Sequence, residues 1–281
     1  MKTIKKKLLA AVIASSVFGL TGCNATSENQ AAEQLEVNTQ LLQAIAGEHR
    51  SVENKARDQY RHPQQTLEFF GFKPSMTVVE ITPGGGWYTE ILAPALKGTG
   101  KLIGAHYPDT GEDNYYSNSR KRLEKKLASN AVYSEVELSN FIPKQVSELA
   151  PAGSADMVLT FRNLHNWGEE GVQQVFNDAY QALKVGGVLG VVEHRLPEGV
   201  AAGNMNSGYV SVDKTIAQAK AAGFSLAASS EVNANEKDKA SYEKGVWTLP
   251  PVLALKDKDK EKYLAIGESD RMTLKFVKVA K

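Results

Sequence analysis

The sequence predicts an α/β fold in which a mostly parallel sheet is covered by helices on both faces. From residue 77 onward, short apolar runs with the length of strands alternate with longer amphipathic runs typical of helices. Such alternation is typical of parallel strands joined by helical crossovers, which bury both faces of the sheet. In addition, a glycine-rich turn at 83–86 separates the first of these strands from the helix that follows it.

A helical extension is predicted before the sheet. Apolar residues between 41 and 60 are spaced loosely as in one helix, and His62-Pro63 interrupts the pattern. A second helix through 66–70 is expected to end at Gly71 and Pro74, since glycine and proline terminate helices. The folded domain is therefore expected to occupy 41–281.

Seven strands and four further helices follow along the chain. The predicted strands are 77–81, 101–106, 133–138, 156–161, 188–193, 224–228 and 272–277. The predicted helices are 88–96, 120–128, 169–183 and 211–222. The segment 237–262 has no apolar period apart from 246–255, so we interpret it as a long surface excursion.

Composition excludes several classes of protein. A hydrophobic content of 42% supports a large core and excludes a disordered chain. The single cysteine cannot form an internal disulfide. The balance of 33 Lys and Arg against 32 Asp and Glu indicates no basic face, so no nucleic-acid partner is expected.

The first 22 residues have the pattern of a bacterial lipoprotein signal peptide. Four lysines near Met1 precede a short apolar run over 8–20, which ends in Leu20-Thr21-Gly22-Cys23. This ending resembles a lipobox, in which the cysteine is lipidated and becomes the new N-terminus. The alternative is an ordinary buried helix with a chance cysteine. The polar stretch 23–40 is interpreted as a flexible tether.

A lipid at Cys23 would anchor the protein in the bacterial cell envelope. An acidic residue directly after the cysteine is associated with the retention of lipoproteins in the inner membrane, and this sequence has Asn24 at that position. We therefore expect the periplasmic face of the outer membrane, with the lipid as the only membrane contact.

The turn after the first strand is the most informative motif. Glu80 lies near the end of the strand, and Gly84, Gly85 and Gly86 follow it. Glycines at a strand-to-helix turn let backbone N–H groups approach a ligand closely. The motif predicts a ligand site at the carboxyl edge of the sheet.

Three motifs together resemble class I S-adenosylmethionine-dependent methyltransferases. These are Glu80-x-x-x-Gly84-x-Gly86, the run 156–159 leading to Asn163-Leu164-His165, and the run 182–187 before a strand ending in Glu193-His194. More closely, the sequence resembles a bacterial group of exported predicted methyltransferases, which shares the blocks 61–63, 83–94, 162–167 and 270–271. The similarity covers roughly 50–281. It implies a Rossmann-like fold with a seven-stranded sheet and S-adenosylmethionine as cofactor.

The resemblance also implies which residues contact the cofactor. Gly84 and Gly86 would lie against its methionine moiety, and Glu80 would organise the loop. The sequence departs from the family at Thr82, which replaces a glycine, and at His106, which replaces an acidic residue and is followed by Asp109 and Glu112. The full set of expected cofactor contacts is Glu80, Thr82, Pro83, Gly84, Gly85, Gly86, Tyr88, His106, Arg162 and Asn163.

Three histidines follow predicted strands and should lie at the same edge. His106 is two strand spacings from the fourth strand, on the order of 10 Å, so it is poorly placed to join the others. His165 and His194 follow adjacent strands and can meet. Either could be the base that methyl transfer from a protonated nucleophile requires, with Asn163 beside them. The alternative is that each is an ordinary half-buried polar residue.

The resemblance implies S-adenosylmethionine-dependent methyl transfer to a small-molecule or envelope acceptor. One alternative is a non-catalytic module that binds a metabolite on the same fold, which the changes at Thr82 and His106 favour. Another is a metal-assisted hydrolase or lyase that uses His165, Glu193 and His194. We expect no metal, because the sequence contains no two-histidine helix motif or other strong metal-ligand spacing. No particular oligomeric state is indicated.

Overall fold

A computed structural model describes residues 39–200 and 207–280 of the chain. Residues 39–281 form one compact unit. The expected signal peptide over 1–22, Cys23 and the tether up to 38 lie outside the described residues. Within the described part of the chain, no helix is both long enough and apolar enough to cross a bilayer.

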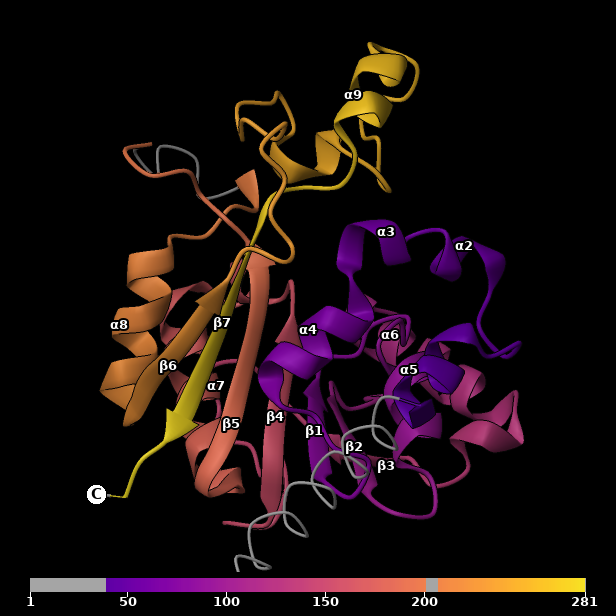
Figure 1. The fold of residues 1–281 in the computed structure, drawn as a ribbon, viewed down its shortest axis with the longest axis vertical. Coiled ribbons are helices and arrows are strands. Elements are labelled where there is room, and N and C mark those ends of the chain that lie inside the picture. The colour runs from indigo at the N-terminus through magenta and orange to yellow at the C-terminus, as the bar shows by residue number, and fades with distance from the viewer. Residues whose placement is uncertain (1–38, 201–206, 281) are drawn as a thin grey trace, which may run out of the picture. The chain divides into compact units, whose positions relative to one another are not determined.

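The structure contains one seven-stranded sheet, with strand order β3-β2-β1-β4-β5-β7-β6. The strands are β1 Thr77–Ile81, β2 Lys101–His106, β3 Glu137–Asn140, β4 Ala155–Phe161, β5 Leu183–His194, β6 Phe224–Ser230 and β7 Arg271–Lys278. Strands β1 to β5 pair in parallel, whereas β7 runs antiparallel between β5 and β6 (Figure 1). The predicted mostly parallel sheet is confirmed, and the carboxyl ends of β1, β2, β4 and β5 share one edge.

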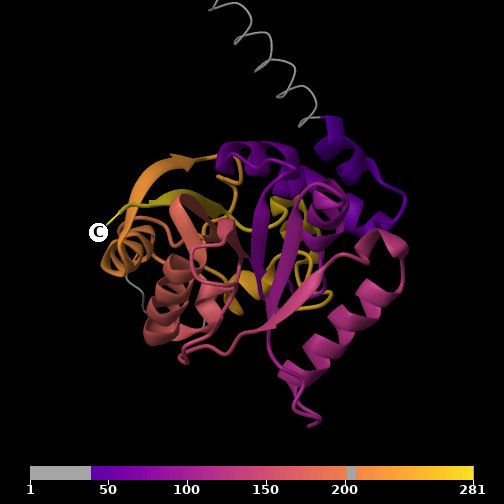
Figure 2. The ribbon, with the colours of Figure 1, turned by 90° about the horizontal axis from the view of Figure 1, so that it is seen from below.

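Helices cover both faces of the sheet, as the apolar strands predict. The covering helices are α4 Pro63–Phe70, α5 Thr89–Leu96, α6 Tyr115–Ala128, α7 Gly168–Ala182 and α8 Val212–Ala222. Successive β1 side chains enter different cores: Val78 packs with α4 and α5, and Val79 packs with α7. Side chains alternate across a strand, so a strand covered on both faces is apolar throughout. Figure 2 shows the helices on either side of the sheet.

The N-terminal extension is divided into short helices, so the prediction of one helix over 41–60 is wrong. The first helix of the extension spans 39–46, and it is followed by α2 Val52–Lys55 and α3 Asp58–Arg61. A new helix begins at α2 because the Ser51 side chain accepts a hydrogen bond from the Asn54 backbone N–H at 3.2 Å. The breaks fold the extension back over the carboxyl edge of the sheet (Figure 1).

The predicted strand over 133–138 is misplaced. Residues Ala131–Tyr133 form a 3-10 helix, η1, and β3 begins only at Glu137. The Asn130 side chain accepts a hydrogen bond from the Val132 N–H at 3.0 Å, which starts this turn. Tyr133 is buried, but it belongs to this 3-10 helix and not to a strand of the sheet.

The segment 237–262 is more than a surface excursion. It contains a 3-10 helix, η4 Gly245–Thr248, and runs into α9 Lys260–Ile266. Val246 and Leu249 are buried, because they pack inward while the charged residues around them face water. The segment stands over the carboxyl end of β5 and the start of β7 (Figure 1), so it covers the edge where a ligand site is expected.

The turn after β1 is fixed by hydrogen bonds from both sides. The Thr89 hydroxyl at the start of α5 donates to a Glu80 carboxylate oxygen at 2.6 Å. The Thr82 N–H donates to the Ala105 carbonyl on β2 at 2.7 Å. Burial raises the pKa of Glu80 to about 7, although the Thr89 bond opposes the rise.

This raised pKa predicts that Glu80→Gln changes the pH dependence of stability. Between about pH 4.5 and 7 the folded chain keeps a proton on Glu80 that the unfolded chain loses, so stability falls as the pH rises through this window. Gln remains neutral and can still accept from Thr89. Urea unfolding should therefore show a variant that gains roughly 1–3 kcal/mol over the wild type at pH 8 and little at pH 4.5.

The matched control is Glu170→Gln, because the Glu170 side chain is 87% exposed. It should follow the wild type at every pH. If the Glu80 and Glu170 variants gave parallel curves, Glu80 would not hold its proton in the folded state.

Candidate functional site

Two pockets open at the carboxyl edge of the sheet and share three residues, Thr82, Gly84 and Asn163. The first, of about 580 Å³, is named the tyrosine pocket after Tyr107, Tyr115 and Tyr116 in its lining. The second, of about 360 Å³, is named the arginine pocket after Arg57, Arg61, Arg162 and Arg271. Both volumes suit small molecules.

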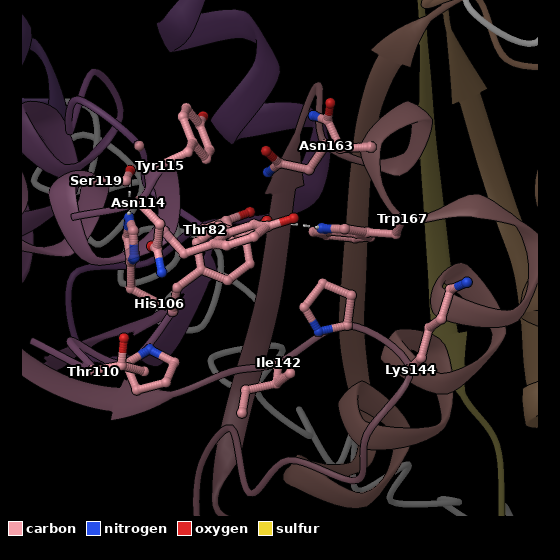
Figure 3. A pocket seen from close by; sticks show the side chains of 16 residues that line it. Thr82, His106, Thr110, Asn114, Tyr115, Ser119, Ile142, Lys144, Asn163 and Trp167 are labelled. Atoms are coloured by element: carbon pink, nitrogen blue, oxygen red, sulfur yellow. Dashed lines mark hydrogen bonds between the residues drawn. The ribbon is translucent and has the colours of Figure 1, made fainter. Parts of the chain in front are cut away.

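The tyrosine pocket lies between the end of β2 and the segment after β4. Figure 3 shows His106, Ser119 and Tyr115 on one side, and Asn163 and Trp167 on the other. The rings of Tyr107 and Tyr116 are 4.6 Å apart at their centroids and make an aromatic wall. This wall suits a flat ring such as a nucleobase.

His106 is a buried, neutral member of the tyrosine pocket. One ring nitrogen, Nε2, lies 3.2 Å from the Ser119 hydroxyl, and the other, Nδ1, has no partner among the described residues. Burial lowers the pKa of His106 to about 4. Asp109 and Glu112 are outside the lining, and Asp109 accepts the Gly111 N–H at 2.9 Å instead. The lining therefore offers the neutral groups of His106 and Ser119 in place of a carboxylate, and Lys144 is its cationic member.

The glycine turn lies between the two pockets. Gly84 has φ of 59°, and a Cβ added to it would meet no atom within 4 Å, so it leaves open space for a ligand. Thr82 also has a positive φ, of 45°, and its buried hydroxyl has no partner within the described part of the chain. Pro83 and Gly85 line the arginine pocket.

Asn163 is fixed at the junction of the pockets. Its amide nitrogen donates to the Ile81 carbonyl at 3.1 Å and to the Thr160 hydroxyl at 3.3 Å. These bonds tie the end of β4 to the end of β1. The side chain is therefore held where the contents of the two pockets would meet.

His165 and His194 meet in the arginine pocket, with ring centroids 5.3 Å apart. Nδ1 of His165 lies 3.0 Å from a Glu193 carboxylate oxygen. Nδ1 of His194 lies 2.5 Å from the Ser269 hydroxyl. The pKa of His194 is held well below its usual range, chiefly by burial and then by the charge of Arg271, so His194 is neutral.

The ligand atoms of His165, Glu193 and His194 lie within 4.8 Å of one another, which is close enough for a metal ion. However, both Glu193 oxygens already accept hydrogen bonds. One accepts from the Leu164 N–H at 2.6 Å, and the other accepts from the His194 N–H at 2.7 Å and from His165. The carboxylate therefore orients His165 and has little capacity left to bind a cation.

The arginine pocket takes its charge from distant parts of the chain. Glu268 accepts from Arg57 at 2.5 Å, pairs with Arg61 at 3.6 Å and binds Arg271. Burial opposes the ionisation of Glu268, but the guanidinium groups, Arg271 foremost, lower its pKa to about 2. The Arg61 guanidinium also lies 4.5 Å from the Trp87 ring centroid.

Several expected site residues lie outside both pockets. Glu80 and Gly86 line neither pocket. A Cβ added to Gly86 would lie 2.8 Å from the Lys126 side chain. Tyr88 stacks on Phe161 in the core, with ring centroids 3.5 Å apart. Among the other expected cofactor contacts, Arg162 lines the arginine pocket and not the tyrosine pocket.

Sequence reasoning missed most of the arginine pocket. Arg57, Arg271, Glu268 and Trp247 come from three separate segments, and none is part of a local motif with a known chemistry. Two signals were available. Arg57 and Arg61 are four residues apart, which places them on one face of a helix, and the shared blocks 61–63 and 270–271 contain Arg61 and Arg271.

Solved structures with similar folds are found at low sequence identity. The [4+2]-cyclase SpnF matches with a TM-score of 0.56 and 15% identity, over 90% of this chain and 96% of its own. A predicted sarcosine dimethylglycine methyltransferase from Galdieria sulphuraria matches with a TM-score of 0.55 and 13% identity, over 80% and 86%. The S-adenosylmethionine-dependent methyltransferase SibL matches with a TM-score of 0.52 and 14% identity, over 80% and 56%.

No protein-family model matches the sequence, and no curated protein matches it. At this level of identity the structural matches bear on the fold alone, and the three proteins carry out more than one kind of reaction by name. In this chain the fold consists of a seven-stranded sheet that is parallel from β3 to β5, with β7 antiparallel beside β5. The chain therefore has the Rossmann-like class I methyltransferase fold.

Proposed function

We propose that this protein transfers a methyl group from S-adenosylmethionine to a small-molecule acceptor in the bacterial cell envelope. The observation that carries the proposal is the junction of the two pockets at Thr82, Gly84 and Asn163. A methyl transferase must hold a donor and an acceptor in adjoining cavities, so that the reacting atoms are aligned. The resemblance in the glycine turn and the shared fold support the same conclusion.

The tyrosine pocket has features that fit S-adenosylmethionine. Its volume of about 580 Å³ and its aromatic wall suit an adenosine group. The unpartnered Thr82 hydroxyl and His106 Nδ1 are polar atoms that a ligand could satisfy. When bound, the cofactor would supply a methyl group on a positively charged sulfur, and the carbon–sulfur electron pair would stay on sulfur when the acceptor takes the methyl carbon.

His165 is the base in this proposal. An ionised Glu193 carboxylate only accepts hydrogen bonds, so Nδ1 of His165 must carry the proton that it donates at 3.0 Å. In the neutral ring with this proton on Nδ1, the Nε2 atom is unprotonated and can take a proton from the acceptor atom. His194 is neutral beside it, and Asn163 positions the ends of β1 and β4 around the reacting groups.

The alternative function is a non-catalytic module that binds a metabolite. One observation favours it: no carboxylate belongs to the described lining of the tyrosine pocket, where the wider methyltransferase family has an acidic residue for the ribose. The fold also admits other chemistry, since the similar SpnF is named as a cyclase. Binding and transfer experiments on the same preparation separate the two functions.

The cellular location belongs to the same proposal. A signal ending in Leu20-Thr21-Gly22-Cys23 supports a lipid anchor at Cys23, with the domain on the periplasmic face of the outer membrane. The chain does not itself provide the methyl donor, so its compartment must receive S-adenosylmethionine from elsewhere.

The first prediction from this proposed function concerns cofactor binding by the full-length chain purified in detergent. Titration calorimetry should show micromolar binding of S-adenosylmethionine and S-adenosylhomocysteine, about −8 kcal/mol. Gly84→Arg should weaken both by at least about 100-fold, because its side chain enters the open space at the pocket junction.

Gly98→Arg is the matched control, since Gly98 also has a positive φ, of 77°, and open space around its Cβ, but lies outside both linings. It carries the same added charge and backbone strain. Equal affinity for the ligands in the two variants would remove the tyrosine pocket as the cofactor site.

The second prediction concerns the base. His165→Gln should lower the transfer of labelled methyl groups from S-adenosylmethionine to a small-molecule cell extract by about 100- to 10,000-fold. Its affinity for S-adenosylhomocysteine should equal that of the wild type, because His165 lines only the arginine pocket. A wild-type protein that binds the cofactor but labels nothing would instead support the binding module.

The third prediction concerns the anchor. Cys23→Ser should move the protein from the membrane fraction to the soluble fraction of lysed cells, since lipidation requires the cysteine thiol. A Thr26→Ser variant keeps Cys23 and should stay with the membranes. If Cys23→Ser stayed in the membrane fraction as the wild type does, the lipid-anchor proposal would be wrong.

A further inference from the structure

We propose that the arginine pocket binds an oxyanion, and that the methyl acceptor is therefore a small molecule bearing a carboxylate or a phosphate group. This inference rests on the proposed function, because it identifies the second pocket as the acceptor site. It names a substrate class that the glycine turn and the fold leave open.

The first observation is an excess of positive charge. Four guanidinium groups, on Arg57, Arg61, Arg162 and Arg271, line the pocket. Among the described residues, the carboxylates that bind charged or titratable groups of the lining are Glu268, which binds three of these arginines, and Glu193, which binds His165. A third carboxylate, Glu90, accepts from the lining residue Asn54, but its charge is paired with Arg50 and Lys126 outside the pocket. Four positive charges against two negative charges leave two positive charges uncompensated. Buried charge of one sign is unfavourable unless a ligand of the other sign balances it.

The second observation is a set of buried guanidinium nitrogens without partners in the described part of the chain. Arg61 is only 3% exposed, yet its Nε and Nη2 make no hydrogen bond. Nη2 of Arg57 and Nε of Arg271 are also unpartnered. Guanidinium groups bind carboxylate and phosphate through paired N–H donors, so such nitrogens provide what an oxyanion requires.

Arg162 is the third observation. Its backbone has φ of 59°, a conformation that costs a non-glycine residue energy, and its N–H is tied to the Val192 carbonyl at 2.7 Å. Among residues 39–200 and 207–280, its guanidinium forms neither a hydrogen bond nor an ion pair. Burial, followed by the charge of Arg271, lowers its pKa to about 10. The fold thus holds a half-buried guanidinium at the wall of the pocket, without a hydrogen bond or ion pair to the described residues.

The apolar residues of the lining indicate what the rest of the acceptor molecule contains. Trp247, Val246 and Pro250 form an apolar side of the pocket, and the Trp247 ring centroid lies 6.0 Å from that of His165. An acceptor with an anionic group and a short apolar or ring portion satisfies both sides. Its reacting atom would lie near His165.

Charge also couples the two pockets. S-adenosylmethionine carries a positive sulfur, which the arginine pocket repels until an anion occupies it. S-adenosylhomocysteine has no such charge. An oxyanion in the arginine pocket should therefore strengthen the binding of S-adenosylmethionine more than that of S-adenosylhomocysteine.

The test is anion titration of the full-length chain in detergent at constant ionic strength. Sodium phosphate and sodium acetate are titrated separately, against sodium chloride, with S-adenosylhomocysteine saturating. At least one oxyanion should bind, and Arg162→Gln should weaken it by tenfold or more, because that side chain has no hydrogen bond or ion pair to the described residues that the substitution would remove. A preference for phosphate or for acetate would distinguish a phosphate ester from a carboxylate as acceptor.

Arg57→Gln provides a second variant in case Arg162→Gln does not fold, since the Arg57 side chain is 21% exposed. It should weaken the same anion. Arg122→Gln is the matched control: Arg122 is exposed on α6 and outside the arginine pocket, so its loss should leave anion affinity unchanged.

The outcomes separate this inference from the proposed function. If S-adenosylhomocysteine binds but neither oxyanion does, or if Arg57→Gln and Arg162→Gln bind anions as the wild type does, the anionic acceptor is wrong and the methyltransferase proposal stands. If S-adenosylhomocysteine fails to bind, the proposed function is wrong, and anion binding no longer identifies an acceptor. An equal effect of the oxyanion that binds on the affinities for S-adenosylmethionine and S-adenosylhomocysteine would also overturn the acceptor assignment.

Discussion

The carboxylate of Glu268 is the interaction on which the arginine pocket depends. It joins Arg57 and Arg61 of the N-terminal extension to Arg271 at the start of β7, across 211 residues of sequence in the case of Arg57. The surrounding guanidinium groups keep it ionised, so it remains a fixed negative charge over the range in which proteins are folded. Without it, the arginines would repel one another, and the hydrogen bond from Arg271 to the Tyr60 carbonyl at 3.0 Å would have to hold the extension to the start of β7 against that repulsion.

Much of the fold could be predicted because strands buried on both faces are apolar throughout and helices are amphipathic. The periods around Val78, Val158 and Val191 identify strands from local sequence alone. Once the strands are known, parallel pairing brings their carboxyl ends to one edge. That geometry explains why Thr82, Asn163 and the His165–His194 pair lie close together in the structure as expected.

Other features depend on contacts that no local pattern records. A turn begun by the Asn130 side chain removes Tyr133 from β3, although the residue remains as buried as a strand residue would be. Tyr88 follows the glycine turn like a ligand contact, but stacking on Phe161 holds it in the core. Arg57, Trp247 and Arg271 meet only after the sheet, the extension and the segment before α9 have packed together. Their shared role is a property of the tertiary structure.

The segment that carries Trp247 lies between β6 and β7, outside the alternating strands and helices. It forms the apolar side of the arginine pocket but contributes no residue to the tyrosine pocket. Insertions and substitutions there can reshape one cavity while the register of the sheet and the glycine turn stay as they are. Under the proposed function, the acceptor side of the site can thus change while the donor side stays the same, because the apolar wall of the arginine pocket comes from a stretch of the gene that the tyrosine pocket does not use.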